Sequence, residues 1–428
     1  MKIKLCLINP PHPYLTNPEA QAPLGLLYVA SSASKFCKAS VNFVNLSGKN
    51  YQDDFDLPKA DIYGLTGTVL DKNGCEAVAR FIRARNVFAK IILGGPIVLS
   101  KNSLSPGLFD SFVHGEGELV ITEIIGDYPK LKREYRGERI FNLDNLPIPS
   151  RHLINGRLGE SVFAQGKNYF EGGSTVISTS RGCPFACTFC ASPKLWGRKI
   201  VYRSAESIAD EVKFIVEKFG VRQLRFSDDN LTNSRSKLEA MCKTFEKFNI
   251  AWRASIRSFP NDMDMMNMMK KGGCVEVCFG TESGDDDVLQ ALKKGTSSSI
   301  NRTAIENAKK AGLDVRILFM IGTPGETHRT VQRNIDFLDS VDKSYDSIAL
   351  TNFTPLPGCA IADDPEKHHC SKHDSWDIDT FNLCLWGPEG MNQWRNFILP
   401  DGMTMAMLTA GKKRMIEYII STNRSNQG

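Results

Sequence analysis

Three cysteines in one short stretch carry the most specific chemistry in this chain. Cys183, Cys187 and Cys190 stand at a CxxxCxxC spacing directly after the apolar pair Val176-Ile177. A loop that leaves a strand can direct three such thiolates at one side of a cubane iron–sulfur cluster, whose fourth iron then stays open to chelation by a small molecule. The alternatives are a zinc site or unrelated thiols. Zinc usually takes four ligands in CxxC pairs, and no second pair follows here.

The residues around the cysteines resemble the cluster motif of the radical S-adenosylmethionine (SAM) superfamily. Arg181-Gly-Cys-Pro184 leads into the motif, Phe189 precedes the last cysteine, and Tyr202-Arg-Ser204 follows it. The resemblance implies a [4Fe–4S] cluster whose open iron binds the amino and carboxylate groups of SAM, with Phe189 at the SAM site. It also implies that an electron from the cluster cleaves SAM to methionine and a 5′-deoxyadenosyl radical.

A catalytic domain over residues 174–360 is predicted to position this loop. Six apolar runs alternate with helical segments, which predicts a partial (β/α)6 barrel of the triosephosphate-isomerase type with functional groups at the carboxyl ends of its strands. The predicted strands are Thr175–Thr179, Gln223–Ser227, Ala251–Ile256, Cys274–Thr281, Asp314–Ile321 and Ser347–Asn352. The methionine-rich run 263–269 has the spacing of one helix and is interpreted as core packing. Cys274 and Cys278 are interpreted as buried thiols on one strand face.

Polar motifs at the ends of these strands match the superfamily in order. Ser227 and Asp229, after the second strand, match the position that receives the ammonium group of SAM. Glu282, in Gly280-Thr-Glu-Ser-Gly284, matches the residue that binds the ribose hydroxyls or the amino group, and Gly322 permits close approach of the adenine. Glu326 is interpreted as the start of the next helix. Isolated acidic residues at strand ends are otherwise solvated or cap helices.

The first 127 residues alternate strand and helix patterns, which predicts a doubly wound, Rossmann-like parallel sheet. Glycine-containing turns fall at the carboxyl ends of its strands, where such sheets bind ligands; alternatively these are only tight turns. The turns resemble the cobalamin-binding domain that precedes many radical SAM barrels. The resemblance implies cobalamin contacts from Pro10, Thr66, Thr68, Gly94, Gly95, Pro96, Gly115 and Glu116. No histidine lies between His12 and His114, so an Asp-x-His-x-x-Gly loop cannot ligate the cobalt.

Two further segments complete the predicted organisation. Residues 128–173 are interpreted as a charged, proline-containing linker. Residues 361–428 are interpreted as a C-terminal segment whose Trp376, Trp386 and Trp394 form a substrate lid, and which ends in a helix over Met405–Ile420. Its cluster of His368, Cys370 and His373 is open to a metal-site interpretation, although such loops more often lie at the surface or line a substrate site.

The bulk composition narrows the classes of protein. The 428 residues carry a net charge of +5 without a basic stripe, so no nucleic-acid partner is expected. No run of eighteen apolar residues and no signal peptide is found, so we expect a cytoplasmic protein without membrane contact and with reduced thiols.

These features together predict an enzyme. The leading hypothesis is a cobalamin-dependent radical SAM methyltransferase that uses a 5′-deoxyadenosyl radical and methylcobalamin to methylate an unactivated carbon or similar centre of a small-molecule or peptide substrate. It would take electrons from a donor such as flavodoxin or ferredoxin. The alternatives are a cobalamin-containing cyclase or rearrangement enzyme, a methylthiotransferase-like enzyme with Cys6, Cys37 and Cys75 at an auxiliary cluster, and a non-enzymatic cobalamin- or cluster-binding regulator.

Overall fold

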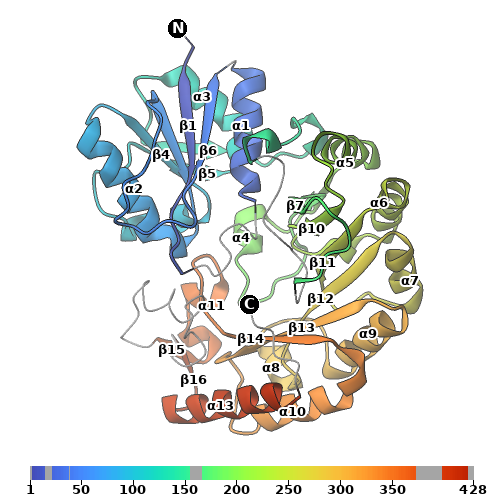
Figure 1. The fold of residues 1–428 in the computed structure, drawn as a ribbon. Helices are drawn as coiled ribbons and strands as arrows, with labels where there is room; N and C mark the ends of the chain where they lie inside the picture. Colours follow the sequence, from blue (N-terminus) through green and yellow to red (C-terminus); the bar gives the residue numbers. More distant parts are fainter. Residues whose placement is uncertain (1, 15–21, 38, 155–165, 373–397, 423–428) are drawn as a thin grey trace. The chain divides into compact units, whose positions relative to one another are not determined.

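The computed structural model describes residues 2–14, 22–37, 39–154, 166–372 and 398–422 (Figure 1). The chain divides into two compact units; the described residues up to 154 belong to the first unit and those from 166 onward to the second. Within these described ranges, no helix combines the length and apolarity needed to cross a bilayer.

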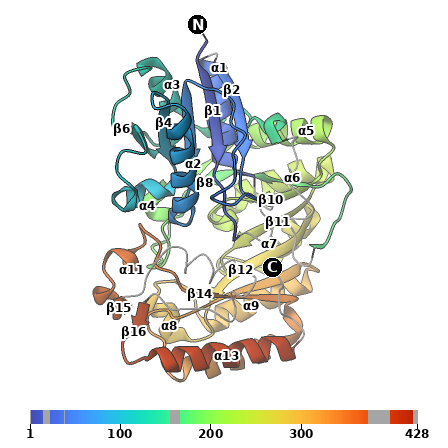
Figure 2. The ribbon, with the colours of Figure 1, turned by 60° about the vertical axis from the view of Figure 1, so that its left-hand side comes forward.

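The first unit is built on a six-stranded sheet with helices on both faces, as predicted (Figure 2). All neighbouring strands are parallel, in the order β2-β1-β3-β4-β5-β6. Helix α2 (Lys72–Arg85) packs on one face, and helices α1 (Leu24–Phe36) and α3 (Gly117–Asp127) pack on the other. The strands are β1 (Lys4–Asn9), β2 (Ser40–Asn45), β3 (Ile62–Thr66), β4 (Lys90–Gly94), β5 (Ser111–Gly115) and β6 (Glu134–Gly137).

Strand β6 lies inside the segment that the sequence predicted to be linker. It pairs in parallel with β5, so the sheet extends beyond residue 127. The strand has four residues, of which only Tyr135 is buried, and it forms one edge of the sheet. Because a short edge strand buries few side chains, its sequence lacks the apolar pattern on which strand prediction depends.

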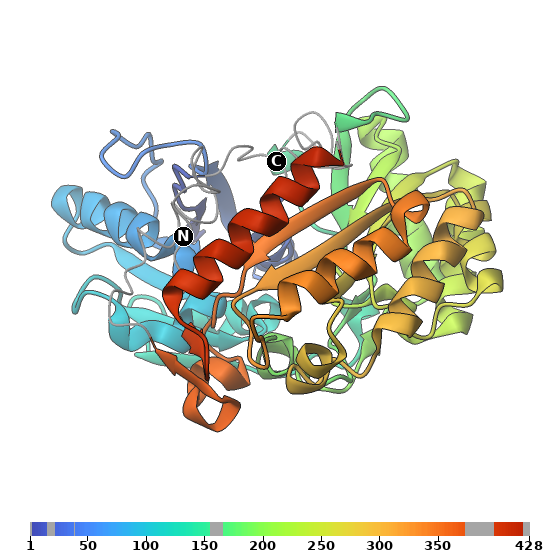
Figure 3. The same cartoon turned by 90° about the horizontal axis from the view of Figure 1, so that it is seen from below.

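The second unit is an open, six-stranded parallel sheet in which the strands follow one another in chain order, the predicted half-barrel (Figure 3). The strands are β7 (Ser174–Ile177), β10 (Gln223–Phe226), β11 (Ala251–Ile256), β12 (Cys274–Glu282), β13 (Asp314–Ile321) and β14 (Ser347–Asn352). One large apolar cluster joins the sheet to helices α5 (Ala205–Phe219), α6 (Arg235–Phe248), α7 (Met263–Lys271), α9 (Ser298–Lys310), α10 (Thr330–Ser340) and α13 (Met405–Ser421).

Local sequence signals account for these helices. In α5, the Ser204 hydroxyl accepts a hydrogen bond from the amide of Ser207 at 3.1 Å, and Gly220 ends the helix in a left-handed conformation. In α7, the predicted use of the methionines is confirmed, because Met265, Met266 and Met269 lie in the core.

The two cysteines of β12 are both buried, but the prediction that they share one face is wrong. A register shift opposite Trp252 and Arg253 places one extra residue in β12. Cys274 therefore packs in the helix-side core, whereas Cys278 lies on the other face, 3.1 Å from a guanidinium nitrogen of Arg253. A β-bulge of this kind reverses the alternation of faces and leaves no mark in the sequence.

The C-terminal segment adds a small apolar layer. Helix α11 (Ala360–Asp363) and the antiparallel strands β15 (Cys370–Lys372) and β16 (Ile398–Pro400) contribute to a cluster that contains Cys359 and Cys370. Helix α13 coincides with the predicted last helix to within a residue. His373, Trp376, Trp386 and Trp394 lie outside the described residues, so the predicted lid and metal ligand at these positions stay predictions.

Candidate active site

The three predicted cluster ligands lie in one loop at the carboxyl end of β7. The loop begins and ends in a two-stranded ribbon, in which β8 (Ser180–Arg181) pairs antiparallel with β9 (Val201–Tyr202). Cys187 is buried, Cys183 and Cys190 are half-buried, and the amide of Cys190 donates to the carbonyl of Cys187 at 3.2 Å. Burial raises the pKa of the Cys190 thiol to about 11 and also raises that of Cys183, so metal binding at neutral pH must displace protons from both.

The donor set of this loop fits a cluster. In the described part of the chain, no three histidine, cysteine, aspartate or glutamate side chains converge on the position of a single metal ion. A cubane makes no such demand, because each cysteine ligates a different iron. The three thiols lie close enough to perturb one another electrostatically. Sulfur is a soft donor and a cubane needs no carboxylate ligand, so the loop is chemically suited to iron–sulfur ligation.

Arg257 is a site residue that the sequence analysis missed. It directly follows β11, and its Nη1 donates to the sulfur of Cys187 at 3.1 Å while the guanidinium lies 3.8 Å from the ring centroid of Phe185. Its Nη2 is buried and has no hydrogen-bond partner among the residues that the structure describes. A buried guanidinium with an unused donor is costly, so this nitrogen indicates an acceptor at the site. In the sequence, Arg257 is only a cationic residue at the end of a predicted strand, and such a residue is usually solvated.

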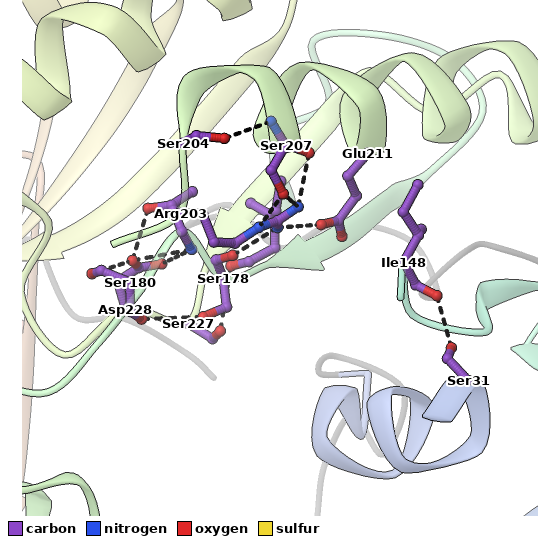
Figure 4. A network of polar contacts seen from close by, with 12 residues as sticks. Ser31, Ile148, Ser178, Ser180, Arg203, Ser204, Ser207, Glu211, Ser227 and Asp228 are labelled. Atoms are coloured by element: carbon purple, nitrogen blue, oxygen red, sulfur yellow. Dashed lines mark hydrogen bonds and ion pairs between the residues drawn. The ribbon is translucent and has the colours of Figure 1, made fainter. Parts of the chain in front are cut away.

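Two adjacent aspartates after β10, Asp228 and Asp229, differ in burial, and Figure 4 shows the surroundings of Asp228. Asp228 is buried and accepts hydrogen bonds from the backbone and hydroxyl of Thr179 and from the hydroxyl of Ser180, the last at 2.6 Å. Burial raises its pKa, and these hydrogen bonds oppose the rise. Asp228 therefore fixes the backbone that leads into the cysteine loop. Ser227 and Asp229, the predicted SAM contacts, are exposed, and Asp229 also accepts a hydrogen bond from the amide of Gly182 at 3.1 Å.

The base of the loop is held by a second buried network. Arg203 forms an ion pair with Glu211 of α5 and donates to the carbonyl of Ser178 at 3.0 Å (Figure 4). Its amide also donates to the carbonyl of Thr179 at 2.9 Å. The motif residues that follow the cysteines therefore have a structural function, which is to tie α5 to the end of β7.

Glu282 stands at the end of β12 in a strained conformation, with a φ of 65°. Its carboxylate accepts a hydrogen bond at 2.6 Å from Lys294, which is buried and was not predicted. The Lys294 ammonium lies 5.4 Å from the ring centroid of Phe189 in the cysteine loop. A Cβ on Gly280 would come within 2.7 Å of the Glu282 carboxylate and 2.9 Å of Lys294, so the glycine of this motif makes room for the ion pair.

Gly322 follows β13 with a φ of 85° and begins a turn that is closed by Glu326. The Glu326 carboxylate accepts hydrogen bonds from the amide and hydroxyl of Thr323, both at 2.9 Å. The prediction that Glu326 begins the next helix is wrong, because α10 begins at Thr330 and Glu326 is buried in the turn. The structure thus places Glu282 at the last position of its strand, and Phe189, Ser227, Asp229 and Gly322 in segments that follow strands, all at the carboxyl end of one sheet.

The predicted cobalamin contacts occupy the carboxyl ends of β1, β3, β4 and β5 in the first unit. Several have partners that explain them without a ligand. The Thr68 hydroxyl accepts from the amide of Leu70 and donates to Asp71 at 2.9 Å, and buried Glu116 is paired with Arg139 at 2.5 Å. A Cβ on Gly95 would lie 2.5 Å from the Thr66 hydroxyl, so two adjacent turns need this glycine. Gly94 and Gly115 are the last residues of β4 and β5, and Pro10 and Pro96 follow β1 and β4.

Comparison with known proteins agrees with the geometry of the second unit. Residues 177–338, which include the cysteines, Glu282 and Gly322, match the radical SAM superfamily. A half-barrel with a three-cysteine loop after its first strand defines an iron–sulfur enzyme that acts on SAM. The second unit therefore contains a radical SAM superfamily domain, and the cofactors of that superfamily are a [4Fe–4S] cluster and SAM.

Relatives and solved structures extend the similarity to the first unit. The chain is 28% identical to an uncharacterised methyltransferase of Pyrococcus horikoshii, over 79% of this chain and 77% of that protein. It is 24% identical to bacteriochlorophyllide d C-12(1)-methyltransferase of Chlorobaculum tepidum, over 84% of this chain and 77% of that protein. The structure of the radical SAM methyltransferase TsrM from Kitasatospora setae, with cobalamin and a [4Fe–4S] cluster bound, has a TM-score of 0.70 at 14% identity, covering 100% of this chain and 91% of that one.

Proposed function

We propose that this protein is a cobalamin-dependent radical SAM methyltransferase that acts on a small-molecule or peptide substrate, with a flavodoxin or ferredoxin as its electron donor. The observation that carries the proposal is the three-thiol loop on an open parallel half-barrel, with the unused Arg257 donor beside it. Support for the methyl transfer comes from the relatives named as methyltransferases and from the fold shared with TsrM, which binds cobalamin.

In this proposal the residues of the second unit hold and orient the cofactors. When bound, the cluster and SAM supply a 5′-deoxyadenosyl radical, and cobalamin supplies a methyl group. Cys183, Cys187 and Cys190 would hold three irons, and Asp228 fixes the strand end from which their loop starts. The guanidinium of Arg257 would favour added negative charge on the cluster, because it already donates to a ligand sulfur. Ser227, Asp229, Glu282 and Gly322 would contact SAM.

The first unit would hold the corrin along the turns after β1, β3, β4 and β5. The cobalt would have no histidine ligand from an Asp-x-His-x-x-Gly loop, since the sequence has none. Of the two predicted contacts with a hydroxyl, Thr68 uses its hydroxyl in the hydrogen bonds described above. The Thr66 side chain is half-buried at the end of β3, beside the backbone of Gly95. Thr66→Val, which keeps the size of the side chain, is expected to weaken corrin retention, and Thr122→Val on the exposed surface of α3 is the matched control.

The decisive experiment uses anaerobically purified protein that is reconstituted with iron, sulfide and cobalamin. After gel filtration, we expect about one corrin and one cluster to remain bound per chain. With reduced corrin and SAM labelled in its methyl group, methyl transfer should yield labelled methylcobalamin and S-adenosylhomocysteine. Retained corrin without labelled methylcobalamin would favour the rearrangement class, and loss of corrin on the column would refute the cobalamin half of the proposal.

A further inference from the structure

The second sheet has one apolar face and one charged face. Leu224 and Phe226 of β10 pack in the helix-side core, so the intervening Arg225 lies on the opposite, concave face. The same alternation in β11 and β13 places two more arginines on this face. Strand register sets Arg225 opposite Arg253, Arg253 opposite Glu276, and Cys278 opposite Arg316. Arg225 and Arg253 are therefore neighbours on adjacent strands, and Arg316 lies beyond β12, whose Glu276 and Cys278 stand between it and Arg253.

The carboxylates of this face do not offset all of that charge. Glu276 forms an ion pair with Nε of Arg253 at 3.2 Å. Asp314, the first residue of β13, forms an ion pair with Lys167 at 2.5 Å. Arg225 makes no hydrogen bond or ion pair with any described residue. Burial lowers the pKa of Arg225 to about 10, with repulsion from Arg253 as the next cause. Burial also lowers the pKa of Arg316.

The concave face is open toward the ends of the strands. Arg225 and Arg316 are largely buried but not fully enclosed, and Ser227, Ser255 and Thr351, on the same face but nearer the carboxyl ends, are exposed. Arg225 lies two residues below Ser227, or about 7 Å along the strand. A molecule that reaches from the strand ends to Arg225 would thus have one end beside the predicted SAM contacts and the other against the arginines.

We propose that the concave face binds an anionic group of the substrate, a carboxylate or a phosphate, with Arg225 as the recognising residue and Arg316 as its support. An arginine fork matches the two oxygens of such a group and loses little entropy in binding it. The bound anion would offset the repulsion among the three guanidinium groups. The inference rests on the proposed function, for which it names the substrate class.

The test measures anion binding without turnover. Cluster-reconstituted protein is titrated with inorganic phosphate or with acetate, each against chloride at equal ionic strength, by calorimetry and by thermal unfolding. Phosphate or acetate is expected to bind and to raise the melting temperature of the wild type. Stronger binding of phosphate would assign a phosphorylated substrate, and stronger binding of acetate a carboxylic acid.

Matched variants identify the residue. Arg225→Gln should weaken anion binding by roughly tenfold or more, since it removes a charge-assisted hydrogen bond. Without anion it should melt no lower than the wild type, because the repulsion is relieved. Arg302→Gln, which removes the same charge from the exposed surface of α9, should leave binding unchanged. Equal binding by Arg225→Gln and wild type, or no binding to the wild type, overturns the inference.

Two additional measurements keep the result unambiguous. If Arg225→Gln fails to fold, Arg316→Gln is tested in its place, and unchanged anion affinity in that variant contradicts the inference. Formation of 5′-deoxyadenosine from SAM is measured on the same preparations. If anion binding is absent while SAM is still cleaved, the inference alone fails. If anions bind but SAM is not cleaved, the proposed function fails and the anion site stands.

Discussion

The two sheets of this protein have the same number of strands and the same parallel pairing, but they offer chemistry in different places. The first sheet is doubly wound, so its two faces are covered by apolar clusters and only the strand ends are available to a ligand. The second sheet is wound in one direction, with its helices gathered on one face. Its other face can therefore carry arginines, a carboxylate and a thiol in the middle of strands.

The strand ends differ as well. In the first unit, Thr68 and Glu116 have partners within the turns that contain them. In the second unit, Arg257 lies beside a cysteine and has a buried donor with no partner in the described part of the chain. Polar groups whose hydrogen bonds are complete indicate a folding role, and groups left incomplete indicate a ligand. By this criterion Arg257 indicates a ligand at the strand ends of the second unit.

The largest effect is expected from the cluster ligands. Cys187→Ala removes a thiolate that a cubane needs, so we expect loss of bound iron and a fall of roughly a hundredfold or more in 5′-deoxyadenosine formation. Iron and sulfide analysis and product chromatography measure the two quantities. Cys37→Ala, a half-buried thiol of the first unit, is the control and should change neither. Equal losses of iron and of 5′-deoxyadenosine formation in both variants would contradict the assignment of the cluster to the cysteine loop.

Adjacent strand residues test the contrast between the two sheets. Ile91 and Ile92 face opposite sides of the first sheet and are both buried, so truncating either to alanine should cost about 2–5 kcal/mol. In the second sheet, Ile317→Ala should cost a similar amount. Leu318→Ala, on the concave face and half-exposed, should cost about 1 kcal/mol or less. Urea unfolding measures these differences. Equal costs at Ile317 and Leu318 would show that the concave face is packed.

Glu326 should give the second unit a dependence of stability on pH. Burial raises the pKa of Glu326 to about 7, above its ordinary value of 4.5. The folded state therefore holds this proton more tightly than the unfolded state. The stability from this group is present below pH 4.5 and is lost as pH rises toward 7, by at most about 3 kcal/mol.

Glu326→Gln keeps the size of the side chain and removes the titration. The difference in unfolding free energy between the variant and the wild type should therefore shift in favour of the variant between pH 5 and pH 8. A difference that does not change with pH would show that Glu326 titrates normally.

The smallest effect is expected at Arg257. Arg257→Met removes a positive charge beside a ligand sulfur, so the midpoint potential of the cluster should fall by roughly 60 mV, the equivalent of a tenfold change for a one-electron couple. Arg257→Lys should restore part of the difference because it keeps the charge. Potentiometric titration followed by electron paramagnetic resonance measures the shift. A potential that is unchanged in Arg257→Met would remove this residue from the cluster environment.

The sequence predicted what depends on apolar pattern and on local motifs. The strands of the half-barrel were placed to within about two residues, because each is an apolar run that ends at glycine, proline or a polar turn. The cysteine loop, the cap at Ser204 and the end of α5 at Gly220 are also local signals.

What the sequence did not predict depends on register and on long-range pairing. Strand β6 is too short and too exposed to show a pattern. The bulge in β12 separates Cys274 from Cys278, and the pairing of Glu282 with Lys294 spans a helix. Arg225, Arg253 and Arg316 are isolated cations in the sequence and become one feature only when the strands are aligned.

The most direct test asks whether SAM binds to an open iron in the cysteine loop. The reduced, cluster-containing protein is examined by electron paramagnetic resonance before and after addition of SAM, with labelled methyl and carboxyl groups for hyperfine measurement. A [4Fe–4S] signal whose g-values shift on addition of SAM, with coupling from the bound methionine part, is the predicted result. A spectrum that SAM does not change, or a loop that holds zinc without iron, would contradict the account.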